Sequence, residues 1–159
     1  MQRSNHQKTS VAKAGFQPTS ILVVDDNPDH WTLMNLALKQ TMPDVTAIWS
    51  EGADQALAYL DTCVQQKAEL PKLILLDLYL PRRENGLYLL QNLKQPNAPY
   101  NRIPVISFSG STAPKDVADT YALGVTAYTV KSPDYRQWLT YFHTLKAYWW
   151  ETVVSPVAA

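Results

Sequence analysis

The sequence predicts an α/β protein built on a doubly wound, five-stranded parallel sheet with helices on both faces. Five short β-type runs punctuate the chain of 159 residues, and helical patterns separate each run from the next. Uniformly apolar runs, such as ILVV at 21–24 and LILL at 73–76, are typical of parallel strands that are covered on both faces. Right-handed crossovers between such strands lead to a doubly wound sheet.

The predicted elements alternate between strand and helix along the chain. The strands are ILVV at 21–24, VTAIW at 45–49, LILL at 73–76, PVISF at 104–108 and VTAYTV at 125–130. Asn27 followed by Pro28 is typical of an N-cap and a first helical residue, so a helix is expected to begin there and run through WTLMNLALKQ.

The other helices are predicted from apolar residues at helical spacing. The apolar face of the second helix consists of Ala53, Ala56, Leu57, Leu60, Cys63 and Val64. The third is indicated by Leu87, Leu90 and Leu93, and the fourth by Val117, Ala118, Tyr121 and Ala122. The fifth helix covers the segment from Asp134 onward, with Ser132 able to act as its N-cap and Pro133 as its first helical residue.

Composition favours a single domain without an obvious charged partner. The length is about that of one domain, because domains run to ~100–200 residues. Residues 1–19 are expected to form a flexible N-terminal extension, 20–153 the folded domain and 154–159 a C-terminal tail. The 14 basic and 14 acidic residues leave no net charge to attract nucleic acid or an anionic membrane. The chain shows neither a secretory signal nor a membrane-spanning run, so we expect a cytoplasmic protein.

Polar side chains follow the predicted strands at the edge where an open α/β sheet carries its functional crevice. Asp25 and Asp26 follow the first strand, Asp77 the third and Ser109 the fourth, while Lys131 ends the fifth. Converging carboxylates repel one another unless a hard cation such as Mg²⁺ joins them. Asp77 can then be both a metal ligand and a nucleophile toward phosphorus, with Lys131 and Ser109 on the other oxygens of the phosphoryl group.

Each of these residues alone has a simpler explanation. An aspartate can cap a helix or a turn, a lysine can be a solvated surface charge, and a serine can be a loop hydroxyl. Five such residues at successive strand ends favour a site instead.

Four stretches carry a more specific signal: VVDD, LILLDLYLP, PVISFSGS and AYTVKSP. In this order and at these separations they resemble the receiver domain of bacterial response regulators over about residues 20–150. The resemblance implies a flavodoxin-like sheet of order 2-1-3-4-5. It also implies a single-domain response regulator that accepts a phosphoryl group from a sensor histidine kinase on Asp77, depends on Mg²⁺, and signals to a protein partner through a conformational change.

The resemblance also implies roles for individual residues. Asp25, Asp26 and Asp77 would hold Mg²⁺ together with the backbone carbonyl of Tyr79. Ser109 and Tyr128 would form the switch pair, in which the hydroxyl turns toward the phosphoryl group and the aromatic ring follows it inward.

The lifetime of the phosphoryl group is expected to be long. The resemblance implies that Tyr79 and Ser111, two positions after Asp77 and Ser109, flank the path of attacking water. Neither is an acid or amide that is well suited to orient water, so we expect only weak autophosphatase activity.

The sequence also bears on the partners and on the class of protein. Only 28 residues follow Lys131, which leaves little room for a DNA-binding output domain, so the chain is expected to signal to a protein or to pass its phosphoryl group to a phosphotransfer protein. Its length and aromatic C-terminal end are similar to those of regulators that pair with phytochrome-type or other hybrid-family kinases.

Two other classes of protein are alternatives to a response regulator. One is a Mg²⁺-dependent phosphatase of the haloacid dehalogenase type, in which an acid characteristically stands where this chain has Tyr79. The other is a receiver-like scaffold that is never phosphorylated.

The last helix carries more apolar surface than one buried stripe needs. Its sheet-facing side is predicted to consist of Trp138, Tyr141, Phe142, Leu145, Trp149 and Tyr148. An adjoining sector contains Tyr135, Leu139, Trp150 and Val153. Exposed aromatic patches of this kind mark interfaces, so we expect a homodimer through this helix; the alternative is that the four residues cover loops.

Two further groups of residues are expected to be solvated. Arg82, Arg83 and Glu84 lie in the loop after the third strand, where they could contact a kinase but are more simply explained as surface charges. His30 lies in the first helix near the acidic crevice, and because its direction is not fixed by the sequence it is taken as a solvated helix residue.

Overall fold

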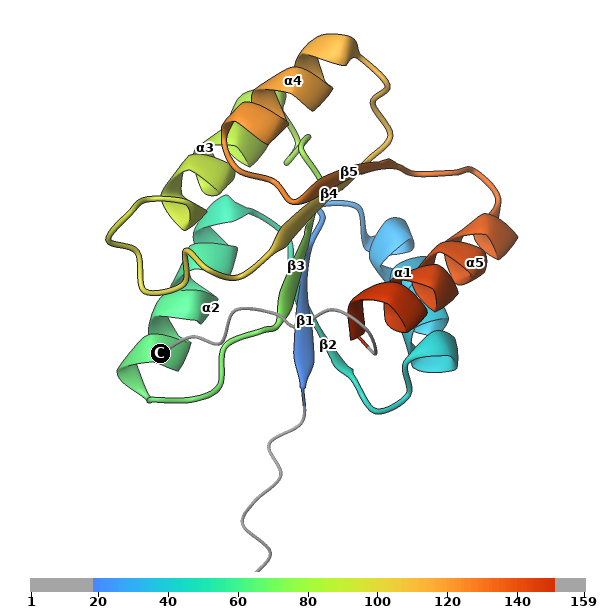
Figure 1. The fold of residues 1–159 in the computed structure, drawn as a ribbon, viewed down its shortest axis with the longest axis horizontal. Helices are drawn as coiled ribbons and strands as arrows, with labels where there is room; N and C mark the ends of the chain where they lie inside the picture. Colours follow the sequence, from blue (N-terminus) through green and yellow to red (C-terminus); the bar gives the residue numbers. More distant parts are fainter. Residues whose placement is uncertain (1–18, 151–159) are drawn as a thin grey trace, which may run out of the picture.

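The computed structural model describes residues 19–150 (Figure 1). Several predicted features lie outside the described residues: residues 1–18 of the predicted extension, the predicted C-terminal tail and Val153. The side chain of Trp150 is also not described. Within the described part of the chain, no helix is both long and apolar enough to cross a bilayer.

The sheet has the predicted architecture. Its strands are β1 (Ser20–Val24), β2 (Thr46–Ser50), β3 (Leu73–Leu76), β4 (Val105–Ser109) and β5 (Ala127–Val130). All neighbouring pairs are parallel, and the order across the sheet is β2-β1-β3-β4-β5. The doubly wound, flavodoxin-like prediction is therefore confirmed, and the carboxyl ends of β1, β3, β4 and β5 share one edge.

Helices cover both faces of the sheet. They are α1 (Pro28–Thr41), α2 (Ala53–Gln65), α3 (Arg83–Leu93), α4 (Pro114–Ala122) and α5 (Tyr135–Leu145), which continues into a π-helical turn, η1 (Lys146–Trp150). Figure 1 shows α1 and α5 on one side of the sheet and α2, α3 and α4 on the other.

Two helix starts test the capping predictions. The side chain of Asn27 accepts hydrogen bonds from the backbone N–H groups of Asp29 and His30, with Pro28 in the first turn, as predicted. The N-cap of α5 is Asp134 rather than Ser132, because the Asp134 carboxylate accepts the N–H of Arg136 while the Ser132 hydroxyl accepts the N–H of Asp134.

Alternation along the strands divides the core between the two faces. Ile21 and Val23 of β1 pack toward α1 and α5, whereas Leu22 and Val24 pack toward α2 and α3. All four are essentially inaccessible to solvent. This two-sided burial is the physical reason for the uniformly apolar strands, because each successive side chain points to the opposite face.

Helix α3 approaches the loop after β3 unusually closely. A Cβ at Gly86 would lie 1.9 Å from the backbone oxygen of Leu78, so only glycine permits this contact. Leu78 follows Asp77 directly, and its side chain is fully buried. Gly86 and Leu78 together therefore anchor the backbone just beyond Asp77.

Helix α4 differs from the predicted apolar pattern. Its buried residues are Asp116 and Thr120, while Tyr121, expected on the apolar face, is 49% exposed. The hydroxyl of Thr120 donates to the backbone oxygen of Asp116, and the Asp116 carboxylate is hydrogen-bonded on its other side. A polar side chain can be buried here because it is satisfied.

Helix α5 packs largely as predicted. Trp138, Phe142 and Leu145 are buried on the α1 side of the sheet, and Tyr141 and Trp149 are partly buried there. Tyr148, which was predicted on this face, is 65% exposed and does not belong to it. In the adjoining sector, Tyr135 and Leu139 are partly buried against the same core.

Candidate functional site

Three strand-end side chains meet at the carboxyl edge of the sheet. Asp25 follows β1 and is fully buried, Asp77 follows β3, and Lys131 follows β5 and is buried. The Lys131 ammonium lies 2.5 Å from Oδ2 of Asp25 and 3.1 Å from Oδ2 of Asp77. The sequence prediction that these residues converge is therefore confirmed, whereas the side chain of Asp26 is exposed.

The second oxygens of the two carboxylates are held by the backbone that follows them. Oδ1 of Asp25 accepts the N–H of Asn27 at 2.9 Å, and Oδ1 of Asp77 accepts the N–H of Tyr79 at 3.2 Å. Each carboxylate therefore closes a turn directly after its strand and has its direction fixed by that turn.

Burial raises the pKa of Asp77 above its ordinary value, and the negative charge of Asp25 adds to this effect. The Lys131 ammonium and the N–H of Tyr79 act in the opposite direction but do not cancel it. The ionised form of Asp77 is thus only partly compensated, which leaves this carboxylate able to gain from a further positive partner.

The donor set fits a hard divalent cation. Three carboxylates, those of Asp25, Asp26 and Asp77, stand at two neighbouring strand ends, and Lys131 is the basic residue that bridges two of them. One ammonium against three carboxylates leaves two negative charges uncompensated. Oxygen ligands with this charge suit Mg²⁺ or Mn²⁺.

Single ligand atoms of Asp25, His30 and Asp77 lie within 4.8 Å of one another, a spacing that a metal could use. The Lys131 ammonium already contacts all three residues, since it also lies 3.1 Å from Nδ1 of His30. The positive group inside this particular cluster is therefore a lysine.

The two predicted switch residues lie on adjacent strands. The hydroxyl of Ser109, fully buried at the end of β4, accepts the N–H of Ser111 at 3.2 Å. The Tyr128 hydroxyl donates to the backbone oxygen of Ser111 at 2.8 Å. Both side chains therefore hold the loop between β4 and α4, and the N–H of Lys131 joins the same strand end through the oxygen of Ser109 at 2.7 Å.

A second carboxylate cluster lies beside the first. Asp116 of α4 accepts hydrogen bonds from the Tyr79 hydroxyl at 2.9 Å, the Ser111 hydroxyl at 2.6 Å and Nε of Arg83 at 2.5 Å. The same guanidinium also pairs with Asp119. These contacts connect the loop after β3, which carries Asp77, to the loop after β4.

The pKa of Asp116 shows the effect of these donors. Burial alone would raise it, but the hydrogen bonds from Ser111, Arg83 and Tyr79 lower it below the ordinary value. The hydrogen bond to Asp116 in turn raises the pKa of the Tyr79 hydroxyl, because the bond favours its protonated form. Asp116 is thus a fully satisfied ionised carboxylate.

Sequence reasoning missed His30, Arg83 and Asp116. The sequence favoured solvated surface positions for His30 and Arg83. Their side chains are partly exposed, at 39% and 23%, but the ring of His30 contacts Lys131 and the guanidinium of Arg83 pairs with α4, and neither contact was predicted. The apolar spacing gave no signal for Asp116, because at 100° per residue it lies on the side of the fourth helix opposite Val117, Ala118, Tyr121 and Ala122.

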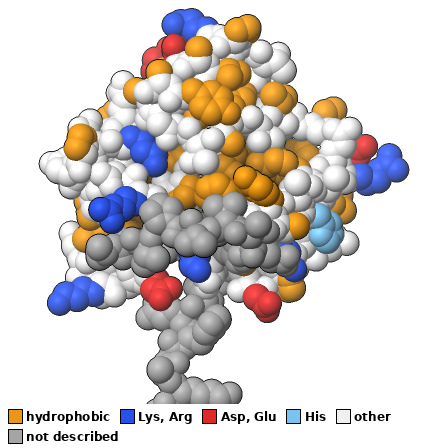
Figure 2. Space-filling view, viewed as in Figure 1, with side chains coloured by type: hydrophobic (Ala, Val, Ile, Leu, Met, Phe, Trp, Pro, Cys, Tyr) orange, Lys and Arg blue, Asp and Glu red, His pale blue; other side chains and the backbone are white. Residues whose placement is uncertain are grey.

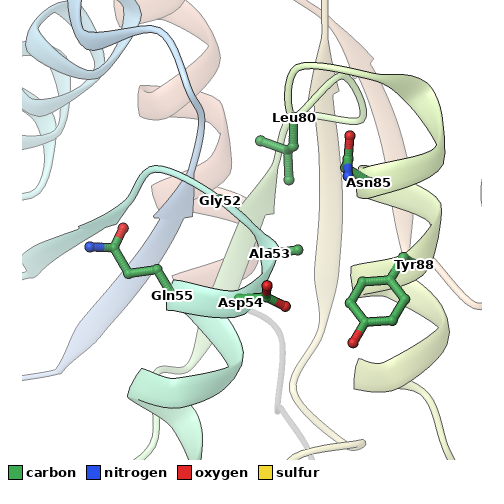
Figure 3. A pocket seen from close by; sticks show the side chains of 7 residues that line it. All are labelled: Gly52, Ala53, Asp54, Gln55, Leu80, Asn85 and Tyr88. Atoms are coloured by element: carbon green, nitrogen blue, oxygen red, sulfur yellow. The ribbon is translucent and has the colours of Figure 1, made fainter.

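A cavity of about 470 Å³ opens between the start of α2 and the start of α3 (Figure 3). Its lining consists of Gly52, Ala53, Asp54, Gln55, Leu80, Asn85 and Tyr88. Figure 3 shows Asp54 and Tyr88 extending into the space between the two helices. Asp25, Asp77 and Lys131 do not line this cavity, which therefore lies apart from the strand-end site.

Comparison with known proteins gives a family match that covers most of the chain. Residues 21–142 match the family described as the response regulator receiver domain. The chain is 34% identical over 146 residues to response regulator Rcp1 of Synechocystis sp., covering 89% of this chain and 95% of the relative.

Two solved structures have the same fold. The Mn²⁺-bound form of Rcp1 superposes with a TM-score of 0.75 at 32% identity, over 88% of this chain and all of the other. The phosphorylated cyanobacterial phytochrome response regulator RcpA superposes with a TM-score of 0.78 at 29% identity, over 89% of this chain and 100% of the other.

Proposed function

The chain belongs to the response regulator receiver domain family, and from this membership we propose that it accepts a phosphoryl group on Asp77 from a sensor histidine kinase in a Mg²⁺-dependent reaction. Proteins of this family are phosphoacceptors in two-component signalling rather than enzymes in the ordinary sense. We propose that the receiver domain spans residues 20–153.

The observation that carries the proposal is the Lys131 bridge between Asp25 and Asp77. In the proposed reaction, a carboxylate oxygen of Asp77 forms a bond to phosphorus while the bond from phosphorus to the kinase histidine breaks. Because the Lys131 ammonium already lies at Asp77, it can pair with a phosphoryl oxygen without a large movement. Ser109, at the end of the next strand, is proposed to contact another phosphoryl oxygen.

The proposed Mg²⁺ ligands are Asp25, Asp26, Asp77 and the backbone carbonyl of Tyr79. The ion would neutralise charge on the phosphoryl group and on the acids that hold it. The uncompensated charge of the three carboxylates supports this ligand set, and the related Rcp1 has been crystallised in a Mn²⁺-bound form.

The kinase partner is proposed to be of the phytochrome type, because RcpA is described as a phytochrome response regulator and Rcp1 is a relative at 34% identity. Such a kinase would meet the protein in the cytoplasm.

The phosphorylated form is proposed to act on a protein partner, or to pass its phosphoryl group to a phosphotransfer protein, without binding nucleic acid directly. Ser109 and Tyr128 would change the shape of the β4–α4 loop through their shared contact, Ser111.

Homodimerisation through α5 is part of the proposal. The proposed interface consists of Tyr135, Leu139, Trp150 and Val153. Tyr135 and Leu139 are only partly buried by their own chain. Figure 2 shows that hydrophobic side chains also gather in the middle of one face of the molecule. Large hydrophobic residues of α4 and β5, Tyr121 and Val130, are exposed as well.

Light scattering tests the dimer. Leu139→Glu combined with Trp150→Glu should give a monomer where the wild type is a dimer, because a charge on the apolar sector opposes its burial. Thr140→Glu, at an exposed neighbouring position of α5, is the control and should remain dimeric. A monomeric wild type, both with and without phosphoryl on Asp77, would refute this part of the proposal.

Intact-mass measurement tests the phosphoacceptor function. A small phosphodonor such as phosphoramidate, with Mg²⁺, should add the mass of one phosphoryl group to the wild type and none to Asp77→Ala. Removal of Mg²⁺ with EDTA should stop the addition. An unlabelled wild type would support the scaffold alternative, and rapid continuous release of phosphate would support the phosphatase alternative.

A further inference from the structure

The Lys131 ammonium has three N–H donors, and the structure supplies three acceptors for them. Two are the carboxylates of Asp25 and Asp77, and the third is Nδ1 of His30 at 3.1 Å. The side chain of Lys131 is only 5% exposed, so water has little access to replace a missing acceptor. We infer that His30 is a positioning residue for the proposed phosphotransfer, because it accepts the third hydrogen bond of Lys131 and so fixes the ammonium at Asp77.

The contact determines the state of the imidazole. A lysine ammonium donates and never accepts, so Nδ1 of His30 must carry a lone pair and the ring proton must lie on Nε2. A neutral ring is therefore the form that fits this arrangement. Its neutrality matters, because a third anionic partner would compensate the charge of Lys131 more fully and leave less of it for a phosphoryl oxygen.

Two elements hold the His30 ring in place. Its backbone N–H donates to the Asn27 side chain in the first turn of α1. The ring meets the ring of Trp138 from α5 edge to face, with centroids 6.0 Å apart and an interplanar angle of 79°. Trp138 is itself fixed by a hydrogen bond from its indole N–H to the backbone oxygen of Ser132, next to Lys131. The acceptor is thus built into the site from α1 and α5 together.

The distances indicate what His30 adds. Lys131 lies closer to Asp25, at 2.5 Å, than to Asp77, at 3.1 Å. A lysine has a flexible four-carbon stem and a compact charge, so with two acceptors alone the ammonium would be free to rotate toward Asp25. With a third acceptor the ammonium has one partner for each N–H, so one N–H stays directed at Asp77, where the phosphoryl group is proposed to arrive.

Two substitutions separate the acceptor from the shape of the ring. His30→Phe keeps a flat ring against Trp138 but removes the acceptor, whereas His30→Gln supplies an amide oxygen on a flexible chain. The rate of phosphorylation by phosphoramidate at saturating Mg²⁺ should fall about tenfold in His30→Phe, the effect of losing one hydrogen bond to a charged group. His30→Gln should recover most of that loss.

Two further measurements distinguish positioning from a structural or metal-binding role. Mg²⁺ binding, followed by tryptophan fluorescence, should have the same affinity in the wild type and His30→Phe. Imidazole ¹⁵N NMR of the unphosphorylated protein should show the Nε2–H form of His30, and Lys131→Met should shift the ring toward a mixture of both neutral forms.

The outcomes are separable from those of the proposed function. Equal rates in the wild type and His30→Phe would overturn the inference, as would an Nδ1–H ring or a loss of Mg²⁺ affinity that accounts for the slower rate. A wild type that accepts no phosphoryl group would refute the proposed function, and the positioning role with it, whereas the NMR signal would still decide whether Lys131 and His30 are in contact. The expected result is a slower His30→Phe with unchanged Mg²⁺ affinity and an Nε2–H ring in the wild type.

Discussion

Two cations at the carboxyl edge of the sheet each join a pair of carboxylates, but the two clusters differ in how completely their acids are satisfied. Lys131 bridges Asp25 and Asp77, and the pKa of Asp77 is nonetheless raised by burial. Arg83 bridges Asp116 and Asp119, and the pKa values of both acids are lowered.

The difference lies in the number of donors. Asp116 accepts from Arg83 and from the hydroxyls of Tyr79 and Ser111, so its charge is compensated within the protein. Asp77 has one N–H of Lys131 and one backbone N–H. A saturated carboxylate holds two loops together, whereas an unsaturated one gains from a metal ion or a phosphoryl group.

The largest expected effect separates the two cations. Lys131→Met should slow phosphorylation of Asp77 by a small phosphodonor about hundredfold, because a preorganised positive donor is removed from the reacting group. Arg83→Met should change the rate less than about threefold, since its guanidinium contacts Asp116 and Asp119. Intact-mass time courses give both rates. Similar losses in the two variants would remove the distinction between the clusters.

The next effect concerns stability. Asp116→Ala should lower the free energy of unfolding by about 2 kcal/mol, because the hydroxyls of Tyr79 and Ser111 lose a charged acceptor. Urea unfolding measures this change. Asp119→Ala is the control, since its more exposed carboxylate shares Arg83 without accepting these hydroxyls, and it should cost clearly less. Equal costs would mean that the hydroxyl contacts contribute little.

The lifetime of the phosphoryl group tests the link between the clusters. Tyr79→Asn should speed autodephosphorylation about fivefold, because it removes an aromatic ring tethered to Asp116 and supplies an amide that can orient water. Tyr79→Phe keeps the ring and should decay less than about twofold faster. Loss of the added mass after removal of the phosphodonor gives the decay. Identical decay in wild type and Tyr79→Asn would contradict a shielding role for Tyr79.

The smallest effect is a pH dependence of opposite sign. The raised pKa of Asp77 means that the folded chain binds this proton more tightly than the unfolded chain, so its ionisation lowers stability as the pH rises through the folded pKa. The lowered pKa of Asp116 contributes stability above its unfolded value, and this contribution is lost as the pH falls through the folded pKa.

Thermal melts in EDTA measure this difference. Relative to wild type, Asp77→Asn should gain more stability at pH 7 than at pH 4. Asp116→Asn should lose more stability at pH 7 than near pH 3. A change of stability in the same direction in both variants would show that the two carboxylates have similar environments.

The sequence carried enough information for the sheet and for part of the site. Strand ends of a parallel sheet share one edge, so Asp25, Asp77 and Lys131 could be placed together from apolar runs and their following residues alone. Those predictions needed no knowledge of how any helix is rotated about its axis.

What the sequence did not predict depends on rotation and on contacts between distant loops. His30 lies in the first turn of α1, where a small rotation decides between solvent and Lys131. Arg83 and Asp116 pair between the first turns of α3 and α4, which no local sequence pattern connects. Ser132 and Asp134 are both good N-caps two residues apart, and the choice between them follows from the path of the chain after Lys131.

The proposed phosphorylation of Asp77 is tested most directly by identifying which aspartate carries the phosphoryl group. Borohydride reduces an acyl phosphate of aspartate to homoserine, so treatment of the phosphorylated protein followed by tandem mass spectrometry marks the residue. We expect homoserine at position 77 and unmodified aspartate at 25, 26 and 116. Homoserine at one of those three positions, with Asp77 unmodified, would contradict this proposal.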